Sequence, residues 1–230
     1  MGRNLLMNLN FILISLCLSG CASQSLANPS DFKSCHADKL RQEARSKELQ
    51  NIVKADQDDR EDFFKKTPEE LQGMAHRDDE RRKRVGEIFG EGCFLNAEDF
   101  AAAALVYQHG DVPEHYLQAF MWAKRAVELG DEKQKRLMGL AIDRYLVNIS
   151  HKQLFASQAT KTDVSNPNSC WCLQQIEPSF PDSLRKEIAN KTFKEAFDWL
   201  EELNKGTNCP NIECTQELKP SPKGTVPGFW

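Results

Sequence analysis

Hydrophobic positions recur every three or four residues over most of this chain, a spacing that predicts amphipathic α-helices. Thr67-Pro68-Glu69-Glu70 is a typical helix start, with Thr67 as the cap and Pro68 at the first position. No segment shows a convincing strand pattern. The predicted fold class is therefore all-α, built of antiparallel helix pairs. Helices are expected at 32–64, 67–89, 96–108, 113–129, 131–147 and 184–203.

Two stretches lack this periodicity. Residues 148–169 are polar and are expected to form a long loop with a turn at 166–168. Residues 220–230 hold three prolines and two glycines and are expected to be extended or disordered. The regular part of the fold should therefore end before 220.

A short apolar run lies near the amino terminus, from Leu5 to Leu18. It is too short for a spanning helix, which needs roughly 20 apolar residues, and it fits the apolar region of a secretory signal. Leu18-Ser19-Gly20-Cys21 follows and resembles the lipobox of bacterial lipoproteins. The resemblance implies removal of the segment before Cys21 and acylation of Cys21, with palmitate among the chains. An ordinary signal peptide with an incidental cysteine is the alternative.

The residue after Cys21 is Ala22 rather than Asp. In Gram-negative lipoproteins, which this region resembles, that favours export to the outer membrane, with the anchored chain facing the periplasm. Several acyl chains on one cysteine would hold the protein durably in the membrane. The expected organisation is a signal peptide at 1–20, a lipidated tether at 21–31, a helical domain at 32–206 and a Cys/Pro-containing extension at 207–230.

Charge narrows the choice of partners. The formal net charge is −4 over 230 residues, so no strongly basic face is expected and nucleic acid is not a predicted partner. After the signal there is no second apolar run that could span a membrane. The expected partners are the membrane, through the lipid on Cys21, and a periplasmic protein or peptide.

The chain has eight cysteines. The lipobox resemblance implies that Cys17 is removed with the signal and that Cys21 carries the lipid. An even number remaining in an oxidising compartment predicts disulfides. Cys170 and Cys172 are too close in sequence to pair easily with each other. We expect them to pair with the two most C-terminal cysteines, stapling that segment, and the first two to pair with each other. The six are Cys35, Cys93, Cys170, Cys172, Cys209 and Cys214.

A zinc site is the competing interpretation of the last four cysteines. The gaps in Cys170-x-Cys172 and Cys209-x4-Cys214 differ from the usual zinc spacings. A redox role would favour a Cys-x-x-Cys turn, which is absent. No metal and no cofactor are predicted.

One segment resembles a single SEL-type tetratricopeptide-like repeat. The resemblance implies two antiparallel helices packed through small and aromatic residues. A weak second copy covers 135–147, whereas a stable stack needs about three repeats, so the resemblance supports helix-pair geometry rather than a long array. The matching residues are Ala103, Leu105, Tyr107, Gly110, Asp111, Val112, Tyr116, Ala119, Trp122, Lys124, Arg125, Ala126, Gly130 and Asp131.

A broader resemblance, over roughly 56–203, is to a family of uncharacterised bacterial domains. The family implies fold and domain extent but no activity. Its last motif usually ends in Gly-Thr-Gln, where this chain has Ala156-Ser157-Gln158, a departure at the expected tight turn. The shared motifs are Asp56-Gln57-Asp58-Asp59-Arg60, Arg81-Arg82-x-x-Val85, Gln108-His109-Gly110, Asp143-Arg144-Tyr145-Leu146 and Lys152-Gln153-x-Phe155-x-Ser157-Gln158.

These motifs supply the candidate ligand-binding residues. Gln108, His109, Asp143 and Arg144 could converge in a groove and bind a polar ligand or act as an acid–base set. The alternative is a buried polar network in which Arg144 pairs with a carboxylate and His109 caps its helix. Gln153 joins the set through its own motif.

Two arginines complete the set. Arg60 lies four residues after Asp56, and Arg82 four after Asp78, so each could form a helix-surface ion pair. If Arg60 and Arg82 instead face inward, they would suit an anion or a carboxylate. The mixed charge run 77–84 is expected to be a solvated helix face.

Two functions are consistent with these observations. The leading hypothesis is a non-enzymatic interaction or scaffold module held at the outer membrane, because helix-pair domains present surfaces suited to protein or peptide partners. The alternative is a small-ligand receptor or hydrolase acting on an envelope polymer, centred on His109, Asp143 and Arg144. No glycine-rich phosphate loop and no Gly-x-Ser-x-Gly or His-Glu-x-x-His motif is present.

Overall fold

A computed structural model describes residues 35–163, 166, 168–209 and 212–222. The described residues all belong to one unit of the chain, Lys33–Trp230. The lipobox, Cys21 and the predicted tether lie outside the described residues.

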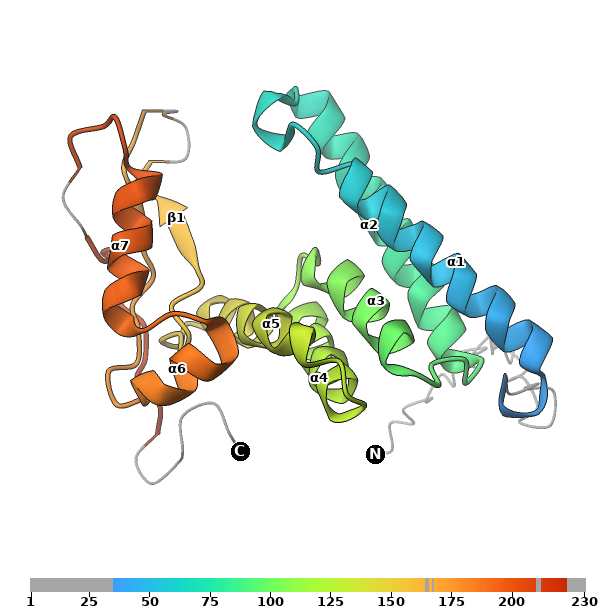
Figure 1. Ribbon diagram of the computed structural model, residues 1–230. Coiled ribbons are helices and arrows are strands. Elements are labelled where there is room, and N and C mark those ends of the chain that lie inside the picture. The colour runs from blue at the N-terminus through green and yellow to red at the C-terminus, as the bar shows by residue number, and fades with distance from the viewer. Residues whose placement is uncertain (1–34, 164–165, 167, 210–211, 223–230) are drawn as a thin grey trace, which may run out of the picture. The chain divides into compact units, whose positions relative to one another are not determined.

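Helices dominate this unit (Figure 1). A small antiparallel sheet pairs β1, Ala159–Lys161, with β2, Trp171–Leu173. The prediction of a chain without strands is therefore wrong, while the prediction of a helical fold is confirmed. The helices are α1 Lys39–Asp58, α2 Pro68–Gly90, α3 Ala97–Gln108, α4 Pro113–Glu128, α5 Lys135–Asn148, α6 Asp182–Ala189 and α7 Phe193–Leu203.

Local capping explains where the helices begin. Thr67 accepts a hydrogen bond from the Glu70 backbone N–H, while the Glu70 carboxylate accepts one from the Thr67 N–H. Asn96 and Asp99 form the same reciprocal capping box before α3. Each box satisfies two N–H groups that the first helical turn leaves unpaired, and the predicted starts at 67 and 96 are confirmed.

Two predicted helices are wrong in extent. The helix expected over 32–64 is shorter: Asp38 caps α1 by accepting from the Arg41 N–H, and the chain turns at Asp62, which has a φ of +53°. The helix expected over 184–203 is two helices. Asn190, with a φ of +57°, ends α6, and Thr192 caps α7.

The expected loop over 148–169 is also corrected. Strand β1 lies inside it and pairs with β2 in the register Thr160 to Cys172. The strands are three residues long, too short to show an alternating pattern in the sequence.

The main hydrophobic core lies among the first five helices and extends to α6. Helix α3 packs against α1, α2 and α4, and α4 packs against α5. Ala103, Ala104 and Ala123 are fully buried, and their small side chains allow α3 and α4 to approach closely. The Trp122 ring lies edge-on to Tyr107, with centroids 4.6 Å apart. This packing fixes the end of α3, where the predicted site lies.

Disulfides hold both ends of the unit. Cys35 pairs with Cys93, Cys170 with Cys209, and Cys172 with Cys214, at Cα separations of 5.0, 5.7 and 5.0 Å. The predicted pairing is confirmed, and the zinc alternative is wrong because those four cysteines are bonded to one another. A smaller core of Leu173, Ile176, Ala196 and Leu200 packs α7 against the sheet.

In the described part of the chain, no helix has the length and apolar character to cross a membrane. None of the clusters of His, Cys, Asp and Glu side chains in that part is arranged to hold a metal ion.

Candidate functional site

The Gln108-His109-Gly110 motif ends α3, and all three of its carbonyl oxygens accept side-chain hydrogen bonds. Arg144 of α5 donates to the Gln108 oxygen at 2.6 Å, and Arg82 of α2 donates to the His109 oxygen at 3.0 Å. The Tyr116 hydroxyl of α4 donates to the Gly110 oxygen at 2.6 Å. The last carbonyls of a helix have no partner within it, so these three side chains cap α3 from three other helices.

The His109 side chain faces α1. Its Nδ1 lies 3.0 Å from the Asp56 carboxylate, which is fully buried. Arg60 pairs with Asp56 at 3.0 Å and with Asp78 at 2.8 Å. The buried carboxylate thus has fixed partners within the chain. We call these residues the helix-end cluster: Asp56, Arg60, Arg82, His109, Tyr116 and Arg144.

Gly110 is required by close packing. A Cβ atom at this position would lie 2.3 Å from the Cβ of His115, far inside contact distance. A side chain there would displace the start of α4. The Gln108 side chain is buried, and its amide oxygen has no hydrogen-bond partner among the described residues.

Asp143 points to a different part of the fold. Its carboxylate accepts backbone hydrogen bonds from Leu154, Phe155 and Ser157 at 2.7 to 3.2 Å. Complete burial raises the pKa of Asp143, and these N–H donors oppose the shift. Ala156 has a φ of +57°. The tight turn therefore forms even though Ala stands where the resembled family has Gly.

Gln153 closes the same turn. Its amide nitrogen donates to the backbone oxygens of Gln158 and Gln174 at 3.0 and 2.7 Å, and its amide oxygen accepts from the Gln158 N–H at 2.8 Å. Gln153 is fully buried. Both polar atoms of its side chain are therefore directed to the chain itself rather than to a cavity.

The predicted triad of His109, Asp143 and Arg144 is therefore not brought together by direct contacts. His109 bonds Asp56, Asp143 bonds the turn after α5, and Arg144 bonds the Gln108 carbonyl. The Arg144 guanidinium contacts carbonyl and amide oxygens rather than a carboxylate. Burial lowers the pKa of Arg144, and the nearby Tyr116 opposes the shift.

The arginine predictions are partly corrected. Arg60 forms the expected pair with Asp56, but that carboxylate is buried rather than at a helix surface. Arg82 faces inward and pairs with Asp79 and Asp111, at 3.5 and 3.4 Å, instead of Asp78. The run 77–84 is thus not entirely a solvated face, because Asp78 and Arg82 are buried in it.

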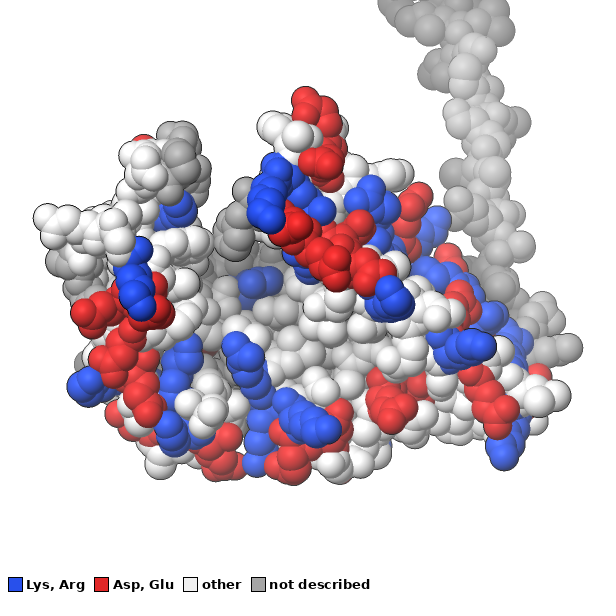
Figure 2. Space-filling view, turned by 45° about the horizontal axis from the view of Figure 1, so that its top comes forward, with Lys and Arg blue, Asp and Glu red and all other residues white. Residues whose placement is uncertain are grey.

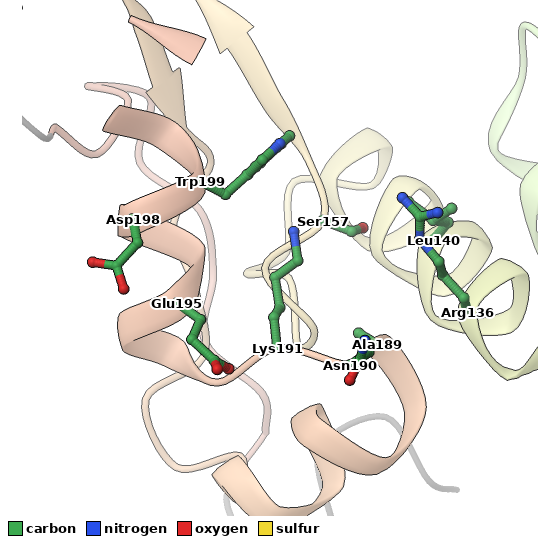
Figure 3. A pocket seen from close by; sticks show the side chains of 9 residues that line it. All are labelled: Arg136, Leu140, Ser157, Ala189, Asn190, Lys191, Glu195, Asp198 and Trp199. Carbon is green, nitrogen blue, oxygen red and sulfur yellow. The ribbon is translucent and has the colours of Figure 1, made fainter. Parts of the chain in front are cut away.

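A different set of residues encloses a cavity of about 580 Å³, which we call the Lys191 pocket (Figure 3). Its walls come from α5, the turn after α5, the linker between α6 and α7, and α7 itself. The lining residues are Arg136, Leu140, Ser157, Ala189, Asn190, Lys191, Glu195, Asp198 and Trp199.

Local backbone geometry places Lys191. Asn190 turns the chain out of α6 with a left-handed φ, and Thr192 starts α7 one residue after Lys191. The Lys191 ammonium lies 4.0 Å from the centroid of the Trp199 ring, a cation–π contact. Figure 3 shows the Lys191 side chain rising through the middle of the pocket, with the Asp198 carboxylate pointing away from it.

Among the described residues, the acidic side chains of this pocket form ion pairs, whereas its basic side chains do not. Lys186 pairs with Glu195 and Lys194 pairs with Asp198, both at 2.8 Å. The hydrogen bond from Lys186 lowers the pKa of Glu195 to about 2.

No Asp or Glu of the described residues lies within ion-pair distance of Lys191 or Arg136. Burial lowers the pKa of Lys191, and the proximity of Arg136 lowers it further, while the buried Asp143 carboxylate opposes the shift. Within the described part of the chain, the pocket thus holds two cations without an ion-pair partner, of which Lys191 is partly buried and Arg136 is exposed.

A second cavity, of about 660 Å³, adjoins the first, and we call it the α5 groove. It shares Arg136 and Leu140 with the Lys191 pocket. Its lining combines apolar residues with charged residues of both signs. None of the seven candidate ligand-binding residues lines either cavity. The α5 groove is lined by Gln50, Val53, Glu98, Ala101, Ala102, Leu105, Asp131, Lys133, Gln134, Arg136, Leu137 and Leu140.

Charge is mixed elsewhere on the surface. Figure 2 shows acidic and basic side chains interspersed over the face that it draws, without a continuous basic stripe. The local excess of positive charge in the Lys191 pocket therefore comes from pairing rather than from composition.

Comparison with known proteins finds no matching family, no matching curated protein and no matching solved structure. The geometry of the helix-end cluster and of the two cavities is consequently the basis for assigning a function.

Sequence reasoning missed Arg136, Lys191 and Trp199. A signal for part of this site was present: Thr192 with Glu195 three residues later is a capping-box pattern, which marks the start of a helix. It would have placed Lys191 in a linker. The unpaired state of the two cations depends on three-dimensional contacts and has no sequence signal.

Proposed function

We propose that this chain is an outer-membrane lipoprotein of a Gram-negative bacterium, anchored through Cys21, whose helical unit binds an extended peptide segment of a periplasmic partner. The lipobox at 18–21 supports the anchor. Three disulfides among the described residues support an oxidising compartment, because such bonds persist outside the cytosol.

The observation that carries the binding function is the pair of adjoining cavities along α5. Ligand sites combine an apolar surface with a few polar groups that fix orientation. The α5 groove supplies the apolar surface, through residues such as Val53 and Leu105, and the Lys191 pocket supplies the charged groups. Because the two cavities share Arg136 and Leu140, they adjoin and can act as one site.

The helices that line the α5 groove support a finer proposal. Helices α1, α3 and α5 contribute to it, while α2 and α4 do not. Alternate helices would line one face in this way if the helix pairs pack as in tetratricopeptide-like repeats. We propose that arrangement for the first five helices.

A small-ligand receptor is the second candidate, and the Lys191 pocket favours it over the predicted triad. Its volume of about 580 Å³ lies in the range of small-molecule sites. The acid–base proposal for His109, Asp143 and Arg144 has no comparable support, because each of these side chains is bonded to a different structural partner.

The peptide function can be tested with a random peptide library whose members have free carboxyl ends. Peptides are selected for binding to the full-length protein purified in detergent. The matched variants are Leu140→Glu, which puts a charge in the shared wall of both cavities, and Met121→Glu, at an exposed α4 position outside them. We expect selected peptides to bind the wild type and Met121→Glu alike and to lose about tenfold or more in affinity for Leu140→Glu.

Near-ultraviolet circular dichroism would confirm that both variants keep the native fold. Selection of no peptide, or of peptides that bind Leu140→Glu as well as the wild type, would contradict a peptide site in these cavities.

A further inference from the structure

We infer that the Lys191 pocket binds the C-terminal carboxylate of a peptide whose last side chain is apolar. This inference rests on the proposed peptide function and adds to it the chemical group that the site recognises. Three features of the molecule carry it: the unpaired cations, the aromatic wall and the adjoining groove.

The charge of the ligand follows from which side chains of the pocket are already paired. Glu195 and Asp198 already hold Lys186 and Lys194, so they are not available to a cationic ligand without loss of an ion pair. The Lys191 ammonium is partly buried and has no carboxylate partner within the described residues. An anion is therefore the complement that the pocket lacks.

The chemistry of the two cations suits a carboxylate. The Arg136 guanidinium offers donors in a planar fork that matches two carboxylate oxygens, and Lys191 adds a point charge. Arg136 stands where the pocket meets the α5 groove, because it lines both. An anionic group bound between these two side chains would thus lie beside the groove.

The remaining walls point to an apolar group next to the anion. Leu140 and Ala189 contribute aliphatic surface, and the Trp199 ring contributes an aromatic face. A chain terminus presents a carboxylate and a side chain on the same carbon atom, so an apolar last residue would meet these walls. A peptide in the α5 groove could end here with the two groups in contact with the two kinds of wall.

Three fluorescein-labelled pentapeptides test the inference with the full-length protein in detergent. The first is Gly-Gly-Ala-Leu-Phe with a free carboxyl end, and the second is the same peptide as its C-terminal amide. The third, the amide of Gly-Gly-Ala-Asp-Phe, moves the carboxylate to a side chain. Fluorescence anisotropy would give each dissociation constant.

We expect the wild type to bind the free acid about tenfold more tightly than either amide. Lys191→Gln and Arg136→Gln should each reduce that preference to about threefold or less. The matched control is Lys205→Gln, which removes the same charge from an exposed side chain outside the pocket and should keep the full preference.

Equal binding of acid and amide by the wild type, or a preference that survives in Lys191→Gln and Arg136→Gln, would overturn the inference. Binding of the third peptide as tightly as the first would overturn recognition of the chain end. If all three bind equally and all lose affinity in Leu140→Glu, the inference fails while the peptide function stands. If none binds and the library selection also yields nothing, the proposed function itself fails.

Discussion

The helix-end cluster and the Lys191 pocket both contain several charged side chains, but they differ in how those charges are paired. In the helix-end cluster, the buried Asp56 carboxylate holds His109 and Arg60, and three side chains cap the carbonyls of α3. In the Lys191 pocket, both acids are paired with lysines of α6 and α7, while Lys191 and Arg136 have no carboxylate partner among the described residues.

This difference distinguishes residues that stabilise the fold from residues that could bind a ligand. Most polar groups of the helix-end cluster bond one another, which stabilises the fold and leaves little for a ligand. The exceptions are Arg82 Nε and the adjoining Gln108 Oε1, which are buried without a partner among the described residues. A partly buried cation without a counter-ion raises the free energy of the folded state, and a ligand of opposite charge can relieve that cost. Most residues of the sequence motifs therefore hold the helices together. The better candidate site is formed by residues outside the motifs, apart from Ser157.

The largest expected effect is on the helix-end cluster. Asp56→Ala leaves Arg60 and His109 without their buried partner, and breaking a buried ion pair costs about 3–5 kcal/mol of unfolding free energy. Urea denaturation followed by circular dichroism would measure it. A loss below about 1 kcal/mol would show that the cluster is not a structural centre.

Disulfide removal tests how the wall of the Lys191 pocket is held. Cys172→Ser with Cys214→Ser removes a bridge that closes a sequence separation of 42 residues beside the core of α7. We expect a loss of about 2–4 kcal/mol in unfolding free energy, because the unfolded chain regains freedom. Thermal unfolding against the wild type would measure it, and an unchanged Tm would contradict the expectation.

Acid should weaken the helical hairpin of α1 and α2. Hydrogen bonds from Arg77 and Arg81 lower the pKa of Asp59 from 3.8 to about 2. The stabilisation is complete above the unfolded pKa of 3.8 and is lost as the pH falls toward about 2. We expect about 1–2 kcal/mol from this group.

Denaturation at several pH values would show this loss, and the decline should be smaller in Asp59→Asn. Equal declines in the two proteins would mean that another group carries the acid sensitivity.

The smallest expected effect on the free energy of unfolding is an increase rather than a loss. Lys191→Met removes a cation whose pKa is lowered by burial and keeps a side chain of similar length over Trp199. We expect unfolding free energy at neutral pH to stay unchanged or to rise by up to about 1 kcal/mol, with loss of carboxylate binding. A decrease of about 2 kcal/mol or more would place Lys191 with the structural residues.

Sequence alone predicted most of the helical fold. The helices at 67–89, 96–108 and 113–129 have both apolar periodicity and helix-start residues. Local sequence is therefore enough to predict their positions. The disulfides followed from the reach of a Cys side chain and the expected compartment. What could not be read was the two-stranded sheet, because strands of three residues have no alternation to detect and depend on pairing with distant residues.

The candidate site was harder to predict. His109 and Asp143 are residue types that often bind ligands or act in catalysis. Their partners, Asp56 and the 154–157 turn, could not be predicted from the sequence. Lys191 looked like one surface lysine among many. Its distinction arises because Lys186 and Lys194 occupy the nearby acids, which only the folded arrangement of α6 and α7 determines.

The most direct test is the pKa of Lys191, measured by NMR on protein with ¹³C-labelled lysine, with Lys191→Met to assign the signal. In the free protein we expect a pKa below 10.5, because the ammonium is partly buried and lies near Arg136. Saturation with the free-acid peptide should raise it, and the amide should not. A pKa of 10.5 or above in the free protein, or no rise when the acid peptide binds, would contradict an unpaired cation that recognises a carboxylate.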